Sequence, residues 1–311
     1  MQTHSPSSDS ASPCTAFRRS EDPHIGSALS SVICYAQRHG ERLVAALCTG
    51  AMLCALSACS MPRLAGRAEA EQQLSPCEKA LTTARAGNTL SQGTPQLQYY
   101  VTELAAPLAW IDVAGHCTDR FAEGALRNAQ SKMVVALLAD KYGQSAPEVT
   151  PARLDGVTTA SISASALDAM ALAEDRAGFA IEVLAARGTT AGATLPLSDM
   201  HKTAAQQLVS LADTMHSSAH TDPRQKVYAI ENLLANPVTI ADKASEQNVP
   251  TTAAIEMDCA RAEIEAVTST KAKPDTDTTM ILAALVAKHA YTAMQLGYPS
   301  SDAALFEQRN S

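Results

Sequence analysis

Apolar side chains recur in alternating steps of three and four positions along several long segments of this chain. On one such segment a single face carries Leu167, Met170, Glu174, Ala177, Ile181 and Leu184. This spacing is typical of a helix that packs one stripe of side chains against other helices. Hydrophobic residues make up 46% of the sequence and aromatic residues only 4%, and alanine, the best helix former, supplies much of the apolar share. The chain is therefore predicted to be all-α.

The helical pattern falls into two parts. An N-terminal helical segment is expected over 76–146, with helices at 76–86, 96–113 and 117–142. Residues 147–160 are rich in turn formers and lack periodicity, which is typical of a linker. Four principal helices, with a shorter one that ends at Pro237, are expected over 161–297, and 298–311 form a C-terminal tail. Four helices of this length are typical of a four-helix bundle.

An apolar run from Leu43 to Ala58 follows a weakly basic lead, RHGER. Its sixteen residues are few for crossing a bilayer, which takes ~20, but they suit the core of a signal peptide. The run ends in LSAC, at Cys59, which resembles the bacterial lipobox. The resemblance implies that the Cys59 thiol receives a diacylglyceryl group and that cleavage makes Cys59 the first residue. The alternatives are an uncleaved membrane anchor and an ordinary buried helix.

The lipobox resemblance also implies a location. Residues 1–58 would be a disordered leader plus a lipoprotein signal peptide, and 59–75 would be a tether. The protein would then sit on the outer face of the cytoplasmic membrane, held by the lipid on Cys59. The Ser/Pro-rich first residues fit a signal peptide poorly, so translation is hypothesised to begin near Val32. A precursor peptide from upstream of Val32, found by mass spectrometry, would contradict that hypothesis.

Three cysteines follow Cys59 and would lie outside the membrane, where disulfides persist. Cys77 and Cys117 each lie near the start of a predicted helix, and a bridge between them would close a loop of about 40 residues. The alternative is two separate buried thiols. Cys259 lies in an apolar helical pattern and is expected to be a small core residue. The sequence has no Cys-x-x-Cys, which argues against zinc-finger and thioredoxin-like sites.

Each principal helix of 161–297 carries one polar side chain on or beside its apolar face. Glu174 lies within the stripe of the first helix, and His201 shares a face with the leucines of the second. Glu256 borders the stripe of the third helix, and His289 aligns with the leucines of the last. The spacing therefore predicts that each helix directs one carboxylate or imidazole toward the centre.

The chain from about Ser161 to Leu296 resembles the small ferritin-like domain of uncharacterised actinobacterial lipoproteins. The resemblance rests on the segments AEDRAGFAIEVLAARG, DMHKTAAQQL, IEMDCARAEIEAV and AKHAYTAM. It implies a ferritin-like four-helix bundle that follows the N-terminal helical segment of an envelope lipoprotein. It implies no established chemistry.

Ferritin-like enzymes hold two metal ions with glutamates and two Glu-x-x-His motifs, because residues three apart project from one helical face. The predicted bundle, 161–297, contains no Glu-x-x-His, and its nearest pattern, Asp213 to His216, lies at a predicted helix end. The preferred interpretation is a structural network without a cofactor, in which Glu and His satisfy each other's hydrogen bonds. The alternative is a degenerate site for iron, manganese or zinc, formed by Glu174, His201, Glu256 and His289.

Other chemistries find little support. The formal net charge is −8 and no basic cluster occurs, so nucleic-acid binding is not expected. The sequence has no GxGxxG, P-loop or GxSxG motif, and no catalytic residue is predicted. Glu263 and Glu265, with Arg261, are interpreted as a solvated helix face. A packing role is preferred over the lining of a ligand groove for the tyrosines that lean toward the surface, which are Tyr99, Tyr100, Tyr228, Tyr291 and Tyr298.

The sequence thus predicts a lipid-anchored, non-enzymatic protein that binds or scaffolds an unidentified envelope protein or small ligand. One alternative is a ferritin-like metalloprotein that uses the inward glutamates and histidines. The other is a helical solute- or peptide-binding protein with a pocket between the two helical parts.

Overall fold

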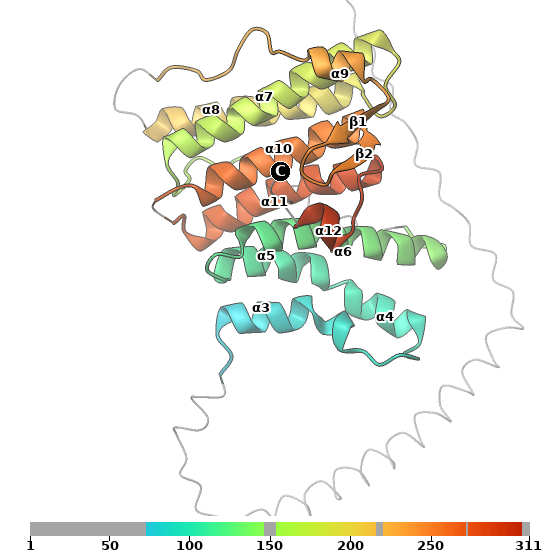
Figure 1. Ribbon diagram of the computed structural model, residues 1–311. Coiled ribbons are helices and arrows are strands. Elements are labelled where there is room, and N and C mark those ends of the chain that lie inside the picture. The colour runs from blue at the N-terminus through green and yellow to red at the C-terminus, as the bar shows by residue number, and fades with distance from the viewer. Residues whose placement is uncertain (1–72, 146–153, 216–219, 272, 307–311) are drawn as a thin grey trace, which may run out of the picture. The chain divides into compact units, whose positions relative to one another are not determined.

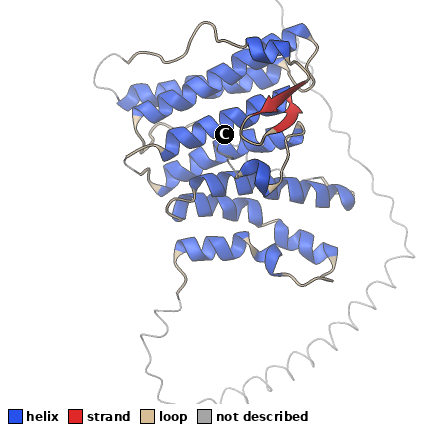
Figure 2. Cartoon of the chain, in the orientation of Figure 1, coloured by secondary structure: helices blue, strands red, loops and turns tan. Residues whose placement is uncertain are grey.

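The computed structural model describes residues 73–145, 154–215, 220–271 and 273–306 (Figure 1). The predicted leader, signal peptide, lipidated Cys59 and most of the tether lie outside these residues. Within them no helix is both long enough and apolar enough to cross a membrane. These residues are mostly helical (Figure 2), as predicted from the spacing of apolar residues.

The helices fall before and after the predicted linker. Before the predicted linker they are α3 (Pro76–Ala84), the 3-10 turn η1 (Ala86–Thr89), α4 (Gln96–Glu103), α5 (Ala106–His116) and α6 (Phe121–Lys141). After it come α7 (Ala164–Arg187), α8 (Leu195–Met215), α9 (Glu231–Ala235), α10 (Thr251–Thr268), α11 (Thr276–Gln295) and α12 (Asp302–Leu305). The helix expected over 96–113 is divided in two because Pro107, in the first turn of α5, cannot donate a backbone hydrogen bond.

Two short strands form a hairpin that the sequence did not predict. β1 (Thr239–Asp242) pairs antiparallel with β2 (Gln247–Pro250). The hairpin lies between α9 and α10, and its last residue is the N-cap of α10. The strands have only four residues each, too few for a period-two pattern to stand out among the turn formers around them.

Helix pairs stack on one another in the part of the chain that the structure describes (Figure 1). The helix α7 packs along α8 and also on α10, and α10 packs along α11. On its other side α11 contacts α5 and α6, which pack against each other. Residues 73–311 accordingly form one compact unit, in which the N-terminal helices lie against the helices that follow the predicted linker.

Small residues allow these helices to approach closely. Ala125 and Ala129 of α6 and Ala171 of α7 are fully buried in the main core. At Gly124 of α6, a Cβ atom would lie 2.6 Å from the backbone oxygen of Trp110 on α5. Real Cβ atoms do not come that close, so the contact between α5 and α6 requires glycine at this position.

A disulfide joins α3 to the end of α5. The sulfur atoms of Cys77 on α3 and Cys117 at the end of α5 lie 2.10 Å apart, the pairing predicted from the sequence. Cys117 and the neighbouring Trp110 are buried in a separate small core between α3 and α5. The disulfide stabilises this core, which is too small to hold the two helices together firmly by apolar packing alone.

The hairpin and the chain after α11 are fastened to α10 by a polar cluster. Asp242 of β1 pairs with Arg261 of α10 at 3.0 Å and accepts a hydrogen bond from the Tyr298 hydroxyl at 2.6 Å. Arg261 also donates to the Tyr298 hydroxyl at 2.6 Å. The expectation of surface-leaning tyrosines was wrong here, because Tyr298 and Tyr228 are 3% and 7% exposed. Arg261 belongs to this cluster rather than to a solvated helix face.

Candidate metal centre

Four helices bring the predicted polar residues together. Glu174 comes from α7, His201 from α8, Glu256 from α10 and His289 from α11. Their exposed fractions are 0%, 1%, 0% and 3%. The inward orientation that helical spacing predicted is therefore found for all four side chains, and they meet at one point of the core.

The four side chains form a closed ring of hydrogen bonds. His201 contacts Glu174 through Nδ1 at 2.5 Å and Glu256 through Nε2 at 3.0 Å. His289 contacts Glu256 through Nδ1 and Glu174 through Nε2, both at 3.0 Å. The two imidazoles stack, with their centroids 4.7 Å apart and an angle of 16° between their planes. Because ionised carboxylates only accept hydrogen bonds, all four ring nitrogens donate.

The two carboxylates lie on opposite edges of the imidazole pair. Glu174 contacts Nδ1 of His201 and Nε2 of His289, whereas Glu256 contacts the other nitrogen of each ring. An ion bound by the two nitrogens that face Glu174 would leave the other two free to donate to Glu256. The sequence placed both glutamates in one ligand set, but the geometry gives them different positions relative to the histidines.

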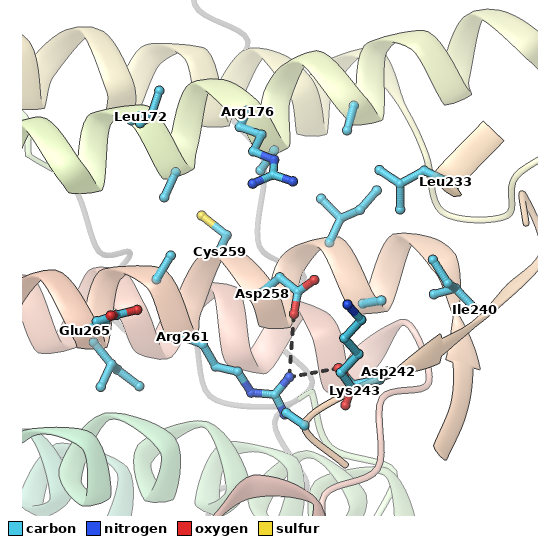
Figure 3. Close-up of a pocket in the computed structure, with 18 of the residues that line it drawn as sticks. Leu172, Arg176, Leu233, Ile240, Asp242, Lys243, Asp258, Cys259, Arg261 and Glu265 are labelled. Atoms are coloured by element: carbon cyan, nitrogen blue, oxygen red, sulfur yellow. Dashed lines mark hydrogen bonds and ion pairs between the residues drawn. The ribbon is translucent and has the colours of Figure 1, made fainter. Parts of the chain in front are cut away.

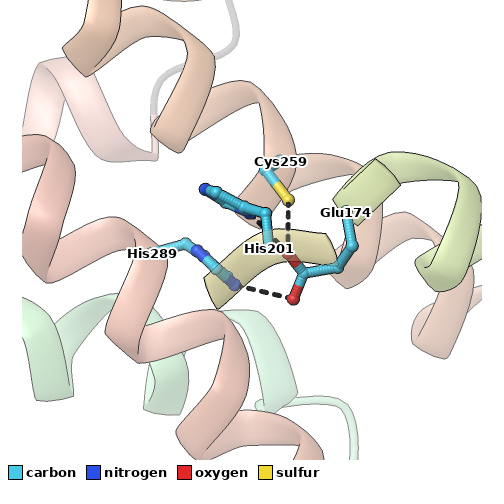
Figure 4. Close-up of side chains that lie close together, drawn as sticks. All are labelled: Glu174, His201, Cys259 and His289. Carbon is cyan, nitrogen blue, oxygen red and sulfur yellow. Dashed lines mark hydrogen bonds and ion pairs between the residues drawn. The ribbon is translucent and has the colours of Figure 1, made fainter. Parts of the chain in front are cut away.

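Cys259 lies on the Glu174 side of this pair (Figure 4). Its Sγ atom is 3.9 Å from Glu174 Oε2, and the side chain is buried. One donor atom from each of Glu174, His201, Cys259 and His289 lies within 4.8 Å of the others. Ligand atoms at about 2.0–2.3 Å from one ion lie at most about 4.6 Å apart, so small side-chain movements would give a coordination sphere.

A third buried glutamate lies nearby and was misjudged from the sequence. Glu263 of α10 is 0% exposed, and neither of its carboxyl oxygens has a hydrogen-bond partner among the described residues. The predicted solvated face was therefore wrong at this position. Glu263 follows Glu256 by seven residues and Cys259 by four, so the three side chains project from one face of α10. The spacing was visible in the sequence, but the charged neighbours of Glu263 obscured it.

Burial and hydrogen bonding shift the pKa values of the four ring residues in opposite directions. Burial alone would raise the pKa of Glu256, but hydrogen bonds from His201 and His289 lower it to about 2. The pKa of Glu174 is lowered for the same reason, with the charges of the two histidines contributing. Burial would lower the pKa of each histidine, yet both values are raised by the two carboxylates. The ring thus holds two carboxylates and two imidazolium groups, with no net charge.

The pKa values of Glu263 and Cys259 are raised, whereas those of Glu174 and Glu256 are lowered. Burial raises the pKa of Glu263 well above its usual range, and the charge of Glu174 raises it further. Burial and the same charge raise the pKa of the Cys259 thiol. Burial thus favours the uncharged form of both groups beside the charged ring. Among the described residues, Glu174, His201, Cys259 and His289 form a group whose ligand atoms lie close enough together to hold one ion.

A cleft of about 1660 Å³ opens beside the centre, mainly between α7 and α10 (Figure 3). Its walls combine apolar side chains such as Leu172 and Leu233 with charged ones such as Arg176 and Asp258. Cys259 lines this cleft and also contacts Glu174. The cysteine therefore lies between the cleft and the buried ring.

Of the remaining sequence pattern, Asp213 to His216, the described residue Asp213 does not join the centre. His216 of the Asp213 to His216 pattern lies outside the described residues. Asp213 itself contacts His220, whose Nδ1 atom is 2.7 Å from the Asp213 carboxylate. The other nitrogen of His220 lies 3.0 Å from Asp168 on α7. This group is separate from the ring of Glu174, His201, Glu256 and His289.

No protein-family model, no curated protein and no solved structure matches this chain. The resemblance to a ferritin-like lipoprotein domain therefore stays a prediction. A function for the centre has to be argued from its own residues and their geometry.

Proposed function

We propose that this chain is a lipid-anchored envelope protein whose helical domain binds one divalent transition-metal ion. The proposed ligands are Glu174, one nitrogen of His201 and one nitrogen of His289. The observation that carries the proposal is the division of the four ring nitrogens between two carboxylates. Two nitrogens point to the side where Glu174 and Cys259 lie, and two are held by Glu256.

Glu256 has the position of an outer partner to metal-bound histidines. A histidine that binds a metal through one nitrogen usually donates its other N–H to a carboxylate or carbonyl, which fixes the tautomer and the ring orientation. Glu256 accepts from both histidines at 3.0 Å. A single carboxylate would thus orient both ligand rings.

The charges of the ring suit an exchange of protons for a metal. Without metal, the two imidazolium groups balance the carboxylates of Glu174 and Glu256. A divalent ion in place of the two protons that face Glu174 would leave the net charge of these groups at zero. Loading would therefore bury no additional net charge, which is the usual cost of a charged group in a core.

Glu263 also favours the metal proposal. A network that served only to fix helix register would have no need of a third, unpartnered carboxyl group beside it. An unpaired buried polar group costs free energy. A cation near Glu174 would give Glu263 an electrostatic partner, because the charge of Glu174 is among the strongest influences on Glu263.

The architectural part of the proposal is a ferritin-like four-helix bundle formed by α7, α8, α10 and α11. Each of these helices supplies one member of the ring. Ferritin-like two-metal centres take a Glu-x-x-His motif from each of two helices, and residues 161–297 contain none. We therefore propose a site for one ion rather than two.

A structural network is the second candidate function. It is favoured by the closure of the ring, in which every carboxylate oxygen of Glu174 and Glu256 and every nitrogen of the two histidines has a partner. Such a network fixes the positions of four helices without any ion. It would suit a scaffold for another envelope protein.

Equilibrium titration of the metal-stripped full chain with zinc or cobalt distinguishes the two functions. The metal proposal predicts one tight site, which a His201→Ala/His289→Ala variant loses. His116→Ala is the matched control, because His116 is an exposed histidine at the end of α5, and it should bind as the wild type does. Absence of tight binding to a folded wild-type chain would favour the structural network.

A further inference from the structure

We infer that Cys259 supplies a thiolate as the fourth ligand of the proposed centre, which makes it a closed tetrahedral zinc site. The inference rests on the proposed function and specifies the ion. Glutamate and histidine alone suit iron, manganese and zinc alike, whereas a thiolate ligand favours zinc and other soft or borderline ions. Four protein ligands around zinc are typical of a structural site, because a catalytic site keeps one position open.

The position of the sulfur supports this assignment. Cys259 lies within 4.8 Å of the donor atoms of Glu174, His201 and His289, whereas Glu256 is on the far edge of the imidazoles. Cys259 and Glu256 are three residues apart on α10 and project from the same face. One turn of the helix thus supplies an inner ligand and the outer partner of the two histidines.

The surroundings of Cys259 give independent support for a missing cation. Glu263, four residues further along the same face, is 0% exposed and has no hydrogen-bond partner among the described residues. The thiol itself donates a hydrogen bond to the Glu174 carboxylate, at 3.9 Å. The thiol of Cys259, the carboxyl group of Glu263 and the carboxylate of Glu174 therefore share this end of the core, where all three would stabilise a divalent cation.

The chemistry of loading is a simple exchange. The S–H bond of Cys259 and the two histidine N–H bonds that face Glu174 break, bonds from the metal to the sulfur and to the two nitrogens form, and three protons pass to solvent without any transfer of electrons. The ion with the Cys259 thiolate and the Glu174 carboxylate is then neutral. The Glu256 carboxylate keeps its charge and accepts from the remaining N–H group of each neutral histidine. Cys259 lines the cleft between α7 and α10 (Figure 3), so ion and proton have a route to and from solvent.

The test is cobalt substitution of the full chain, with Cys259→Ser and Cys259→Ala as variants. Wild-type protein loaded with one cobalt(II) should show a thiolate-to-cobalt charge-transfer band in the near ultraviolet, and both variants should lack it. Zinc affinity should fall more than about 100-fold in the variants, beyond the 10–100-fold typical of outer-shell changes. Circular dichroism establishes that each variant is folded.

A second measurement needs no variant. X-ray absorption at the zinc edge of the wild-type chain should show one sulfur at about 2.3 Å and three nitrogen or oxygen ligands at about 2.0–2.2 Å. Cobalt or zinc bound without sulfur would overturn the thiolate inference and leave the metal proposal in place. Failure of the folded wild-type chain to bind either ion would overturn both.

Discussion

Glu256 contributes to this centre through the two histidines that it orients. Its two carboxylate oxygens accept from His201 and His289 at 3.0 Å each. A glutamine at this position would have one oxygen and one amide nitrogen, and the nitrogen cannot accept the second N–H. One histidine would therefore lose its partner and its fixed orientation.

We accordingly predict that Glu256→Gln lowers metal affinity about 10–100-fold while the chain stays folded. Competition with a chromophoric chelator measures the change. Glu182→Gln is the control, because Glu182 lies on α7 and pairs with the partly exposed Lys202. The metal affinity of this variant should match that of the wild type. Equal affinities for both variants would exclude the outer role assigned to Glu256.

Glu263 should weaken the metal-free protein, because its carboxyl group is buried without a partner. Replacement by methionine keeps a similar volume and removes the unpaired polar group. We predict that Glu263→Met raises the free energy of unfolding of the metal-stripped chain by roughly 1–3 kcal/mol. Urea unfolding measures this change. The control is Glu265→Met, at an exposed position two residues further along α10, which should change the free energy of unfolding little.

In the metal-loaded chain the gain from Glu263→Met should be smaller, since the bound cation would already stabilise the carboxyl group. If Glu263→Met raised the free energy of unfolding equally with and without metal, Glu263 would not interact with the ion. A large loss of stability in the metal-free chain would mean that the carboxyl group has a partner after all.

Residue positions were predicted from the sequence to different degrees. The helical period places Glu174, His201 and His289 inward, because the face of a long helix is set by the spacing of its apolar residues. It did not reveal that Glu174 and Glu256 lie on opposite edges of the imidazoles, which depends on side-chain rotamers and on the packing of four helices. Cys259 was expected in the core, but its neighbours come from three other helices.

At the scale of elements, the disulfide holds α3 to α5 in a small core that buries few large side chains. The loop that it closes spans a sequence separation of 40 residues. The chain-entropy model gives a stabilisation of about 3–4 kcal/mol for a loop of this length. The other contacts of α3 in that core are mainly with alanines and Trp110, so the bridge is a large part of what fixes this helix.

We therefore predict that Cys77→Ala/Cys117→Ala lowers the free energy of unfolding by about 3 kcal/mol and leaves metal affinity unchanged. Chemical unfolding and the chelator competition provide the two readouts. Wild-type protein treated with a reductant should show the same loss of stability. Loss of metal binding together with the bridge would show that α3 supports the centre, contrary to the packing described above.

The hairpin depends on Asp242, which is 6% exposed and pairs with Arg261. Burial would raise its pKa, but hydrogen bonds from Ser245 and Tyr298 and the charge of Arg261 lower it below the ordinary value of 3.8. A group with a lowered folded pKa stabilises the fold above its unfolded pKa. That stabilisation is lost as the pH falls through the lowered value.

Asp242→Asn should therefore destabilise the chain at pH 7 by about 3 kcal/mol, because Arg261 would lose its buried counter-charge. The difference from the wild type should shrink as the pH falls from about 4 toward the lowered folded pKa, because the stabilisation by the ionised carboxylate is lost over that range. Unfolding measured from pH 3 to pH 7 provides the comparison. A difference that does not depend on pH would argue against an ionised Asp242.

The long helices were predicted more completely than the segments that connect them and the contacts between them. The first principal helix predicted after the linker is α7, which ends at Arg187 with Gly188 as a left-handed C-cap. The hairpin of β1 and β2 escaped prediction because strands of four residues carry too little pattern. The contacts of α5 and α6 with α11 could not be read from the sequence, since the helical period gives a buried face but not its partner.

For the whole molecule, the sequence and the structure address different parts. The lipobox-like LSAC predicts a membrane anchor at Cys59, which lies outside the described residues. The structure describes the domain that this anchor would hold at the membrane surface, with a buried ring from four helices. The two parts together give the central claim, that an envelope protein holds a metal ion in a helical core.

Metal content tests this claim most directly. The full chain would be purified without a His tag, and iron, manganese, cobalt, copper and zinc would be quantified per chain by mass spectrometry. The account predicts close to one zinc per chain in the wild type and almost none in a folded Glu174→Ala/His289→Ala variant. A folded wild-type chain without metal, which also takes up none when zinc is added, would contradict it.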